Sequence, residues 1–501
     1  MQDFLDNYFE ITARGSSIGT EVRAGIASFL TVSYVILVNP QILSLTSVPS
    51  TDSVFATCLS SAVGSILCGV VGNLPFALAP GMGLSAYLVY GLVLGDVLTL
   101  PEALTSVLIS GVLQIVFAIT GVSKVVMGVV PRGVKMAIVV GMGILVSMIG
   151  MVSVKLVVKN DKTLVGMGDL ADPSLLISLA GLILIATLVN ANVKGGILIG
   201  ITILTLTFWY LEDEFPTQIM KLPTLEYGPS TYLDLSILSS PSSLQRVFPA
   251  VAAFVFIGIF DVSGVMFGLA ALGGLMKENT GYIPGSLWGF IGSGIGTIVA
   301  GGMGSSPVIV TVECAAGIKE GGRTGLTAVV VGALFLASLF FSPLLGSVPQ
   351  NATAPVLMLV GSMMMGECRN INWDHTATAV PAFLTIVMMP LTYSITNGIV
   401  FGLVSAGAFY FTTGQFFGDI KNMVERRERE QERGERNGLL GGGEEGFKKI
   451  SKNPSFTGEE TVVRKPSFLL NEEDIEKIKE LERGEGGKGV GGGNYGTVQI
   501  G

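Results

Sequence analysis

Long apolar segments separated by short polar or Gly/Pro-containing breaks fill the chain from about residue 24 to residue 416. A helix needs about twenty consecutive apolar residues to cross a bilayer. The pattern therefore predicts an all-α polytopic membrane protein with fourteen spans, seven on each side of a polar loop at 212–247. The predicted spans lie near 24–43, 54–73, 75–93, 102–121, 133–152, 174–191, 195–211, 248–270, 283–303, 305–318, 325–345, 354–366, 380–395 and 398–416.

The composition supports this class and excludes others. Of the 501 residues, 49% are hydrophobic and only 14% are charged, whereas an average soluble domain is about one quarter charged. This excludes a cytosolic enzyme, a disulfide-linked secreted domain and a nucleic-acid binder. The four cysteines stand singly in or beside apolar segments without metal-ligand spacing, so we expect packing residues and no metal or cofactor. They are Cys58, Cys68, Cys314 and Cys368.

The two ends of the chain are polar. Residues 1–23 lack the basic and then apolar order of a cleaved signal, so the first span is expected to be retained. Residues 417–501 include the run ERREREQERGER and two glycine triplets, which predicts a disordered, charged tail. A solvated tail is the simpler interpretation, and a regulatory function is the alternative.

Basic residues near the span ends predict the orientation. Eight of them share the side of the termini and five lie opposite, which favours cytoplasmic termini and an extracellular or lumenal 212–247 loop. The cluster Lys155, Lys159 and Lys162 runs against the rule. We expect the plasma membrane, with internal membranes as the alternative. The eight are Lys124, Arg132, Lys135, Lys194, Lys277, Lys319, Arg323 and Arg369, and the five are Lys155, Lys159, Lys162, Lys221 and Arg246.

The two halves resemble each other in sequence. Val130-Pro131 and Val348-Pro349 each precede a Gly- and Met-rich segment, and the prolines are 349 − 131 = 218 positions apart, close to the length of one half. Seven spans per half would make the second half insert upside down, which is the inverted-repeat plan of many secondary transporters. Shared composition alone is the alternative explanation.

Proline and glycine interrupt the third span of each half. Pro80 precedes Gly81-Met82-Gly83 in the third span, and Gly304-Ser305-Ser306-Pro307 precedes Val308 in the tenth. Irregular backbone at membrane depth is tolerated only where it is buried in protein or lines a cavity. We therefore predict two discontinuous helices with a binding site between them, and the alternative is helix packing through small residues.

Two carboxylates lie within apolar segments. Asp261 is near the middle of 248–270, and Glu313 follows the broken part of the tenth span. A carboxylate inside a membrane costs several kcal/mol unless it is paired or faces water, so both are predicted site residues that also bind and release a proton. A salt bridge from Glu313 to Arg323 is the alternative. His375, in a polar stretch between two spans, is expected to be an exposed loop residue.

Several segments resemble the adenine/guanine/hypoxanthine permease branch of the nucleobase transporter family (nucleobase/ascorbate type). They cover about residues 20–415, and the run after Glu313 is highly specific. The segments are Ala79 to Tyr87, Gly166 to Leu170, Phe260-Asp261, Glu313 to Val329, Ile371 to Asp374 and Pro381 to Thr385.

The resemblance implies a fourteen-span fold of two inverted repeats. Spans one to four and eight to eleven would form a mobile core, and the other spans a gate. The core would carry the substrate by an elevator-type movement coupled to protons. The substrate-binding residues that the resemblance implies are Gly83, Leu84, Ser85, Asp261, Thr311 and Glu313, with Asp261 and Glu313 also coupling protons.

The chain departs from the family pattern at several site positions. Ser85 replaces a common Asn, Gly258 replaces a second acid, and the stretch from Pro307 to Thr311 is less polar than usual. Since Ser offers a single short hydroxyl where Asn both donates and accepts, the preferred base stays open.

The predicted function is a proton-coupled purine nucleobase symporter, with adenine, guanine and hypoxanthine as substrates. The alternatives are transport of another heterocycle such as uracil or xanthine, and anion transport on a related inverted-repeat fold. An anion site would present Lys or Arg at mid-membrane, where this chain has acids. No catalytic constellation supports an enzyme. The expected partners are the base, the proton, the bilayer and a second copy in a homodimer, without nucleic acid.

Overall fold

The computed structural model describes residues 2–123, 130–160, 162–213, 215–216, 218–223, 228, 232–234, 236–237, 241–276 and 283–412. The predicted tail at 417–501, Lys124 and Lys277 lie outside the described residues. Within them the protein is mostly helical, and nine helical segments are long and apolar enough to cross a membrane. They are Ile18–Leu43, Ser50–Val70, Leu100–Thr120, Arg132–Ser153, Pro173–Asn190, Ser243–Gly273, Ser286–Met303, Gly325–Gly346 and Ile395–Thr412. The count of fourteen spans stays a prediction.

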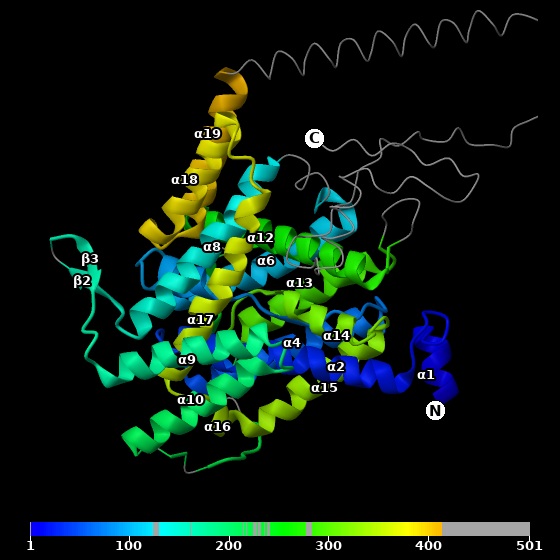
Figure 1. Ribbon diagram of the computed structural model, residues 1–501. Helices are drawn as coiled ribbons and strands as arrows, with labels where there is room; N and C mark the ends of the chain where they lie inside the picture. Colours follow the sequence, from blue (N-terminus) through cyan, green and yellow to red (C-terminus); the bar gives the residue numbers. More distant parts are fainter. Residues whose placement is uncertain are drawn as a thin grey trace, which may run out of the picture. The chain divides into compact units, whose positions relative to one another are not determined.

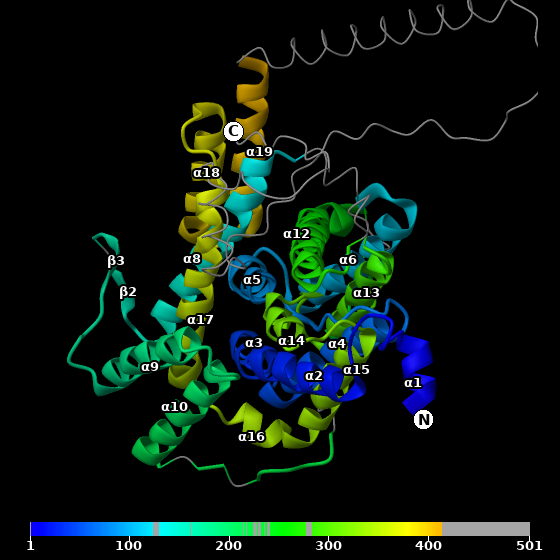
Figure 2. The ribbon, with the colours of Figure 1, turned by 45° about the vertical axis from the view of Figure 1, so that its right-hand side comes forward.

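The helices form two groups (Figure 2), each packed mainly within itself. The first group contains α2 (Ile18–Val32), α4 (Ser50–Val70), α6 (Leu100–Thr120), α12 (Pro241–Gly273), α13 (Ser286–Met303) and α15 (Gly325–Ser338). The second group contains α8 (Arg132–Ser153), α9 (Pro173–Asn190), α10 (Gly196–Glu212), α17 (Gln350–Met364), α18 (Thr376–Thr392) and α19 (Ile395–Thr412). Shorter helices complete the described fold in Figure 1: α1 (Gln2–Phe9), α3 (Val35–Leu43), α14 (Ala315–Lys319), α16 (Ser342–Gly346) and the 3-10 turns Leu339–Phe341 and Met365–Asn370.

Both predicted breaks are present, each as a short strand followed by short helical turns. In the third span, β1 (Leu78–Pro80) is followed by α5 (Met82–Ala86) and the π-helix η1 (Tyr87–Val93). In the tenth, β4 (Val308–Val310) leads into the 3-10 turn η3 (Val312–Cys314) and α14. The two strands pair antiparallel, with Ala79 opposite Ile309. The backbone groups that the broken helices release therefore satisfy one another inside the protein.

Backbone N–H groups on the outer edges of this two-stranded sheet are also hydrogen-bonded. Ser65 of α4 accepts from the Leu78 N–H at 2.8 Å, and Thr297 of α13 accepts from the Val308 N–H at 3.0 Å. Each hydroxyl therefore belongs to the long helix that precedes its strand. The hydrogen bond from the first residue of the strand to the preceding helix is thus the same in both halves of the chain.

Three expectations about the elements are corrected. The chain is not purely α-helical, because β1 and β4 pair and a second hairpin joins β2 (Val157–Asn160) to β3 (Leu164–Met167). The helix of the first predicted span, α2, begins at Ile18 and not near residue 24, and the Ser17 hydroxyl caps it by accepting from the Thr20 N–H. The first span is also broken between α2 and α3, at Ser33-Tyr34.

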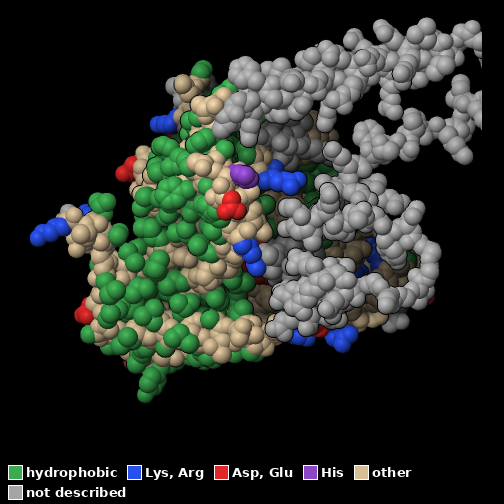
Figure 3. Space-filling view, turned by 45° about the horizontal axis from the view of Figure 1, so that its top comes forward, with side chains coloured by type: hydrophobic (Ala, Val, Ile, Leu, Met, Phe, Trp, Pro, Cys, Tyr) green, Lys and Arg blue, Asp and Glu red, His purple; other side chains and the backbone are tan. Residues whose placement is uncertain are grey.

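Helices that are largely uncovered have apolar outer faces. Ile183 of α9, Tyr210 of α10 and Val404 of α19 are 68%, 78% and 67% exposed. Figure 3 shows a broad area of hydrophobic side chains with few charged ones on the displayed face. Since an apolar surface this extensive is not stable in water, these helices are in contact with lipid.

Adjacent glycines near the end of α13 test the packing of α13 on α6. A Cβ on Gly301 would lie 2.7 Å from the Leu108 N and 2.9 Å from the Leu104 O, whereas a Cβ on Gly302 would meet nothing within 4 Å. We expect Gly301→Ala to destabilise the protein by about 1–3 kcal/mol, since backbone must move. Gly302→Ala is the matched control and should be neutral or slightly stabilising. Thermal unfolding in detergent measures both, and equal midpoints would contradict the described contact.

Candidate functional site

The predicted site residues come from three elements that meet. Pairing of β1 with β4 places α5, which carries Gly83, Leu84 and Ser85, beside the segment with Thr311 and Glu313. Helix α12, with Asp261 near its middle, packs against β4, η3 and α14. The structure therefore brings the three elements together, although not every predicted side chain is free to bind.

Glu313 has an aromatic partner. The Tyr34 hydroxyl donates to Glu313 Oε1 at 2.7 Å, and the Thr31 hydroxyl donates to the Glu313 backbone carbonyl at 3.1 Å. Tyr34 is available for this contact because it lies at the break between α2 and α3. The alternative salt bridge is wrong: the Arg323 guanidinium donates to the carbonyls of Ile318 and Gly322 at 2.7 and 2.9 Å.

Asp261 is half-buried. No hydrogen bond or ion pair joins its carboxyl to another residue of the described ranges. A Cβ on Gly264, about one turn further along α12, would meet nothing within 4 Å, so there is open space on α12 close to Asp261. The preceding Phe260 packs edge-on against Phe256 and lies 5.3 Å from Lys135 Nζ, a cation–π contact between α12 and α8. Among the described residues the Asp261 carboxyl therefore keeps its hydrogen-bonding capacity unused.

Ser85 is fully buried in a hydrogen-bonded cluster. Its hydroxyl donates to Asn39 Oδ1 at 2.6 Å and lies 2.7 Å from the Ser306 hydroxyl. The Asn39 amide in turn donates to Thr57 and Ser305 at 2.8 and 3.0 Å. The cluster joins α3, α4, α5 and the approach to β4. A direct contact between Ser85 and a base stays a prediction, because in this conformation the hydroxyl is fully engaged.

The other predicted residues are also buried. Leu84 is 1% exposed, and a Cβ on Gly83 would lie 3.0 Å from Met142 Sδ of α8, so α5 touches the second helix group there. Thr311 donates to the Ala77 carbonyl at 3.2 Å. Cys314 is buried and accepts from the Ala77 N–H at 3.0 Å, so its thiol makes a polar contact as well as filling space. Thr311 therefore fastens the strand pair.

Sequence reasoning missed Tyr34 and Asn39. The break beside Tyr34 contains no Pro or Gly, so no residue type marked it. Asn39-Pro40, an amide followed by a proline inside an apolar run, was a usable signal, since a polar side chain there needs a partner. His375 is exposed, as expected, and immediately precedes α18.

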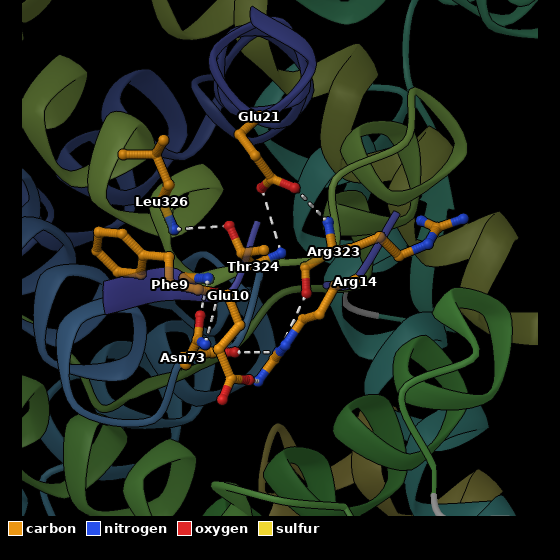
Figure 4. A network of polar contacts seen from close by, with 9 residues as sticks. Phe9, Glu10, Arg14, Glu21, Asn73, Arg323, Thr324 and Leu326 are labelled. Carbon is orange, nitrogen blue, oxygen red and sulfur yellow. Dashed lines mark hydrogen bonds and ion pairs between the residues drawn. The ribbon is translucent and has the colours of Figure 1, made fainter. Parts of the chain in front are cut away.

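The motif that follows Glu313 forms a network at one end of the first helix group (Figure 4). The buried Glu21 carboxylate accepts from the Arg323 N–H at 2.9 Å and the Thr324 N–H at 3.2 Å. Arg14 donates to the Asn73 and Arg323 carbonyls at 2.8 and 3.3 Å. The motif therefore ties α2 and the start of α15 to the segment after α4.

Comparison with known proteins agrees with this arrangement. The sequence model of the Permease family matches residues 19–401. The chain is 35% identical over 408 residues to the guanine/hypoxanthine permease PbuO of Bacillus subtilis, which covers 79% of this chain and 92% of that one. It is 34% identical over 414 residues to the adenine permease AdeP of Escherichia coli, with 83% and 92% coverage.

A solved structure has the same fold. The transmembrane domain of the cyanobacterial bicarbonate transporter BicA superposes with a TM-score of 0.55 at 17% identity, covering 77% of this chain and 96% of that one. At this identity the likeness concerns the fold alone.

Proposed function

Since this chain belongs to the nucleobase/ascorbate family of permeases, and is thus an integral membrane transporter and not an enzyme, we propose that it carries purine bases together with protons. The proposed substrates are adenine, guanine and hypoxanthine. The observation that carries the proposal is the meeting of α12 with the broken tenth span, which places Asp261 and Glu313 in neighbouring elements.

The chemistry of these groups suits a purine. A carboxylate accepts hydrogen bonds from ring N–H and exocyclic amino groups, and a protonated carboxyl donates one. Asp261 has no hydrogen-bond partner among the described residues, and Glu313 accepts from the Tyr34 hydroxyl at 2.7 Å. In the proposal Asp261 and Glu313 bind the base and exchange the proton, while the buried Gly83, Leu84, Ser85 and Thr311 shape the site.

The two helix groups support a proposal for the movement. We assign the first group, with β1, α5, η1, β4 and α14, to the moving core and the second group to the gate. The β1–β4 pair and the Asn39 cluster hold both broken spans within the core, so the site would travel with it as one body. The matched bonds of Ser65 and Thr297 support two repeats at 24–211 and 248–416.

The proposed topology follows from the basic residues. The N-terminal segment 1–23 and the tail at 417–501 would be cytoplasmic, and 212–247 would lie outside, with the protein in the plasma membrane as a homodimer.

Anion transport is a second candidate because the BicA membrane domain shares the fold. The ionisable groups on the described site elements argue against it. Asp261 and Glu313 are acids, and an anion would be repelled by either group in its carboxylate form. Uracil and xanthine, by contrast, carry the same kinds of hydrogen-bond donor and acceptor on their ring edges as the proposed purines.

The test is uptake of radiolabelled adenine by cells that lack their own purine permeases. We expect saturable uptake that guanine or hypoxanthine inhibits and that a proton uncoupler abolishes. Cells with an empty vector are the control, and surface labelling establishes that the protein reaches the membrane. Absence of uptake of every tested base by a surface-expressed protein contradicts the proposal, and uptake that survives the uncoupler contradicts proton coupling.

A further inference from the structure

A concave site adjoins the predicted one. A cavity of about 570 Å³, partly open at the surface, is lined by η1, the first part of α12 and the turn that joins α18 to α19. All six predicted substrate-binding residues are described, and none of them lines it. Along α12 the lining residue Ala250 precedes Asp261 by 261 − 250 = 11 residues, or ~17 Å at the rise of an α-helix. On the third span the lining begins at Tyr87, two residues after Ser85, so the cavity lies next to the predicted site without including its residues. Its size is that of a small-ligand pocket.

Tyr87 separates this cavity from the proposed transport site. It is 2% exposed, and its hydroxyl is hydrogen-bonded to Thr396 of α19. Its ring meets Phe254 edge-on at 5.3 Å, and Phe254 lies between Pro249 and Asp261 on α12. Since Tyr87 and Thr396 belong to different helix groups, this contact closes one end of the cavity and must break if the groups move apart.

The walls suit a flat ring. Tyr90 of η1 and Tyr393 of the α18–α19 turn contact each other, with ring centroids 5.8 Å apart and an interplanar angle of 35°, so a base would stack on this pair and not between its rings. Aromatic side chains that line a groove stack on planar bases without requiring a particular sequence of polar groups. The π-helical geometry of η1, which is rare and frequent at functional sites, places Tyr87 and Tyr90 on the same wall.

The polar groups favour an uncharged ligand. Arg246, the charged residue among those that line the cavity, is ion-paired with Glu102. The exposed Asn397 offers an amide donor and acceptor, and its side chain has no hydrogen-bond partner within the described part of the chain. A neutral planar heterocycle with both donors and acceptors on its edge matches this set.

We propose that this cavity is an outer docking site in which a neutral purine base stacks on Tyr90 and Tyr393 before it passes Tyr87. The proposal rests on the proposed function for the identity of the base and on the proposed topology for the side from which the base arrives. It adds a second binding position and makes Tyr393 a residue that binds substrate.

Protection from a thiol reagent tests occupancy directly. Ser394 lines the cavity, so S394C should react with a membrane-impermeant maleimide, and excess adenine should slow that reaction. The matched control is S236C, because Ser236 is exposed and lies outside the cavity. Both are made with the half-buried Cys368 replaced by Ser, since the other three cysteines are buried. Equal labelling rates with and without adenine in S394C overturn the proposal.

Kinetics test whether docking serves transport. We expect Tyr393→Ala to raise the KM for uptake about tenfold, which equals ~1.4 kcal/mol, with kcat nearly unchanged, because a stacking ring is lost. Tyr393→Phe keeps the ring and should behave as wild type, and Tyr210→Ala, which removes a lipid-facing ring, is the control. An unchanged KM in Tyr393→Ala overturns docking while the proposed function stands. Failure of the proposed function gives a different result from failure of the docking proposal. In that case the wild-type protein takes up no base, whatever the result of the protection experiment.

Discussion

Asp261→Asn and Glu313→Gln are each expected to lower proton-coupled base uptake by about 10- to 100-fold, because a hydrogen bond to a charged group contributes about 1.5–3 kcal/mol. Asparagine and glutamine keep the size of the side chain and remove its ability to bind and release a proton. The effect should therefore appear in uptake and not in folding, so that each variant should elute from detergent gel filtration as the wild type does.

The two acids should differ in one respect. Glu313 is held by the Tyr34 hydroxyl, so Tyr34→Phe should reproduce part of the Glu313→Gln defect, whereas Asp261 has no such partner among the described residues. Asp3→Asn, which removes an exposed carboxylate of α1, is the matched control and should leave uptake unchanged. Uptake is measured at equal surface expression. Full activity in both Asp261→Asn and Glu313→Gln would falsify the assignment of the site.

The broken spans were predictable because their cause is local. Proline has no N–H and disrupts a helix, so Pro80 and Pro307, each beside several glycines or serines, mark their own breaks in the sequence. What the sequence does not contain is the pairing of β1 with β4 across more than 200 residues. That pairing arises because the released backbone groups have no water to bind and find one another.

The hydrogen-bond partners of Glu313 and Ser85 could not be predicted from the sequence. Tyr34 is 279 residues from Glu313, and the break at which Tyr34 lies contains no Pro or Gly. The family resemblance predicted that Ser85 meets a ligand, but its hydroxyl is hydrogen-bonded to Asn39 and lies beside the Ser306 hydroxyl. Both outcomes depend on which helices are neighbours. The residue types at the site were visible in the sequence, and the partners of those residues were set by packing.

The Glu21 network gives the largest expected effect on stability. One buried carboxylate serves three donors: the backbone N–H groups of Arg323 and Thr324, and the Thr327 hydroxyl at 2.5 Å. The two N–H groups belong to the residues that immediately precede α15, and Thr327 lies in the first turn of that helix. The side chain of Glu21 on α2 therefore fixes the start of α15, where the Thr324 hydroxyl provides the helix cap.

Glu21→Ala is therefore expected to destabilise the folded protein by about 3 kcal/mol or more, since each buried donor left without an acceptor costs about 1–3 kcal/mol. Glu21→Gln keeps one acceptor oxygen and should lose less. The comparison is Glu10→Ala at the rim of the same network, because the Glu10 side chain is 61% exposed and its ion pair with Arg14 contributes ~1 kcal/mol or less. Thermal unfolding in detergent should rank the variants Glu21→Ala, Glu21→Gln, Glu10→Ala from least to most stable. If Glu21→Ala and Glu10→Ala unfold at the same temperature, the network does not hold α2 to α15. The residues of the motif after Glu313 would then serve transport and not the rigidity of the first helix group.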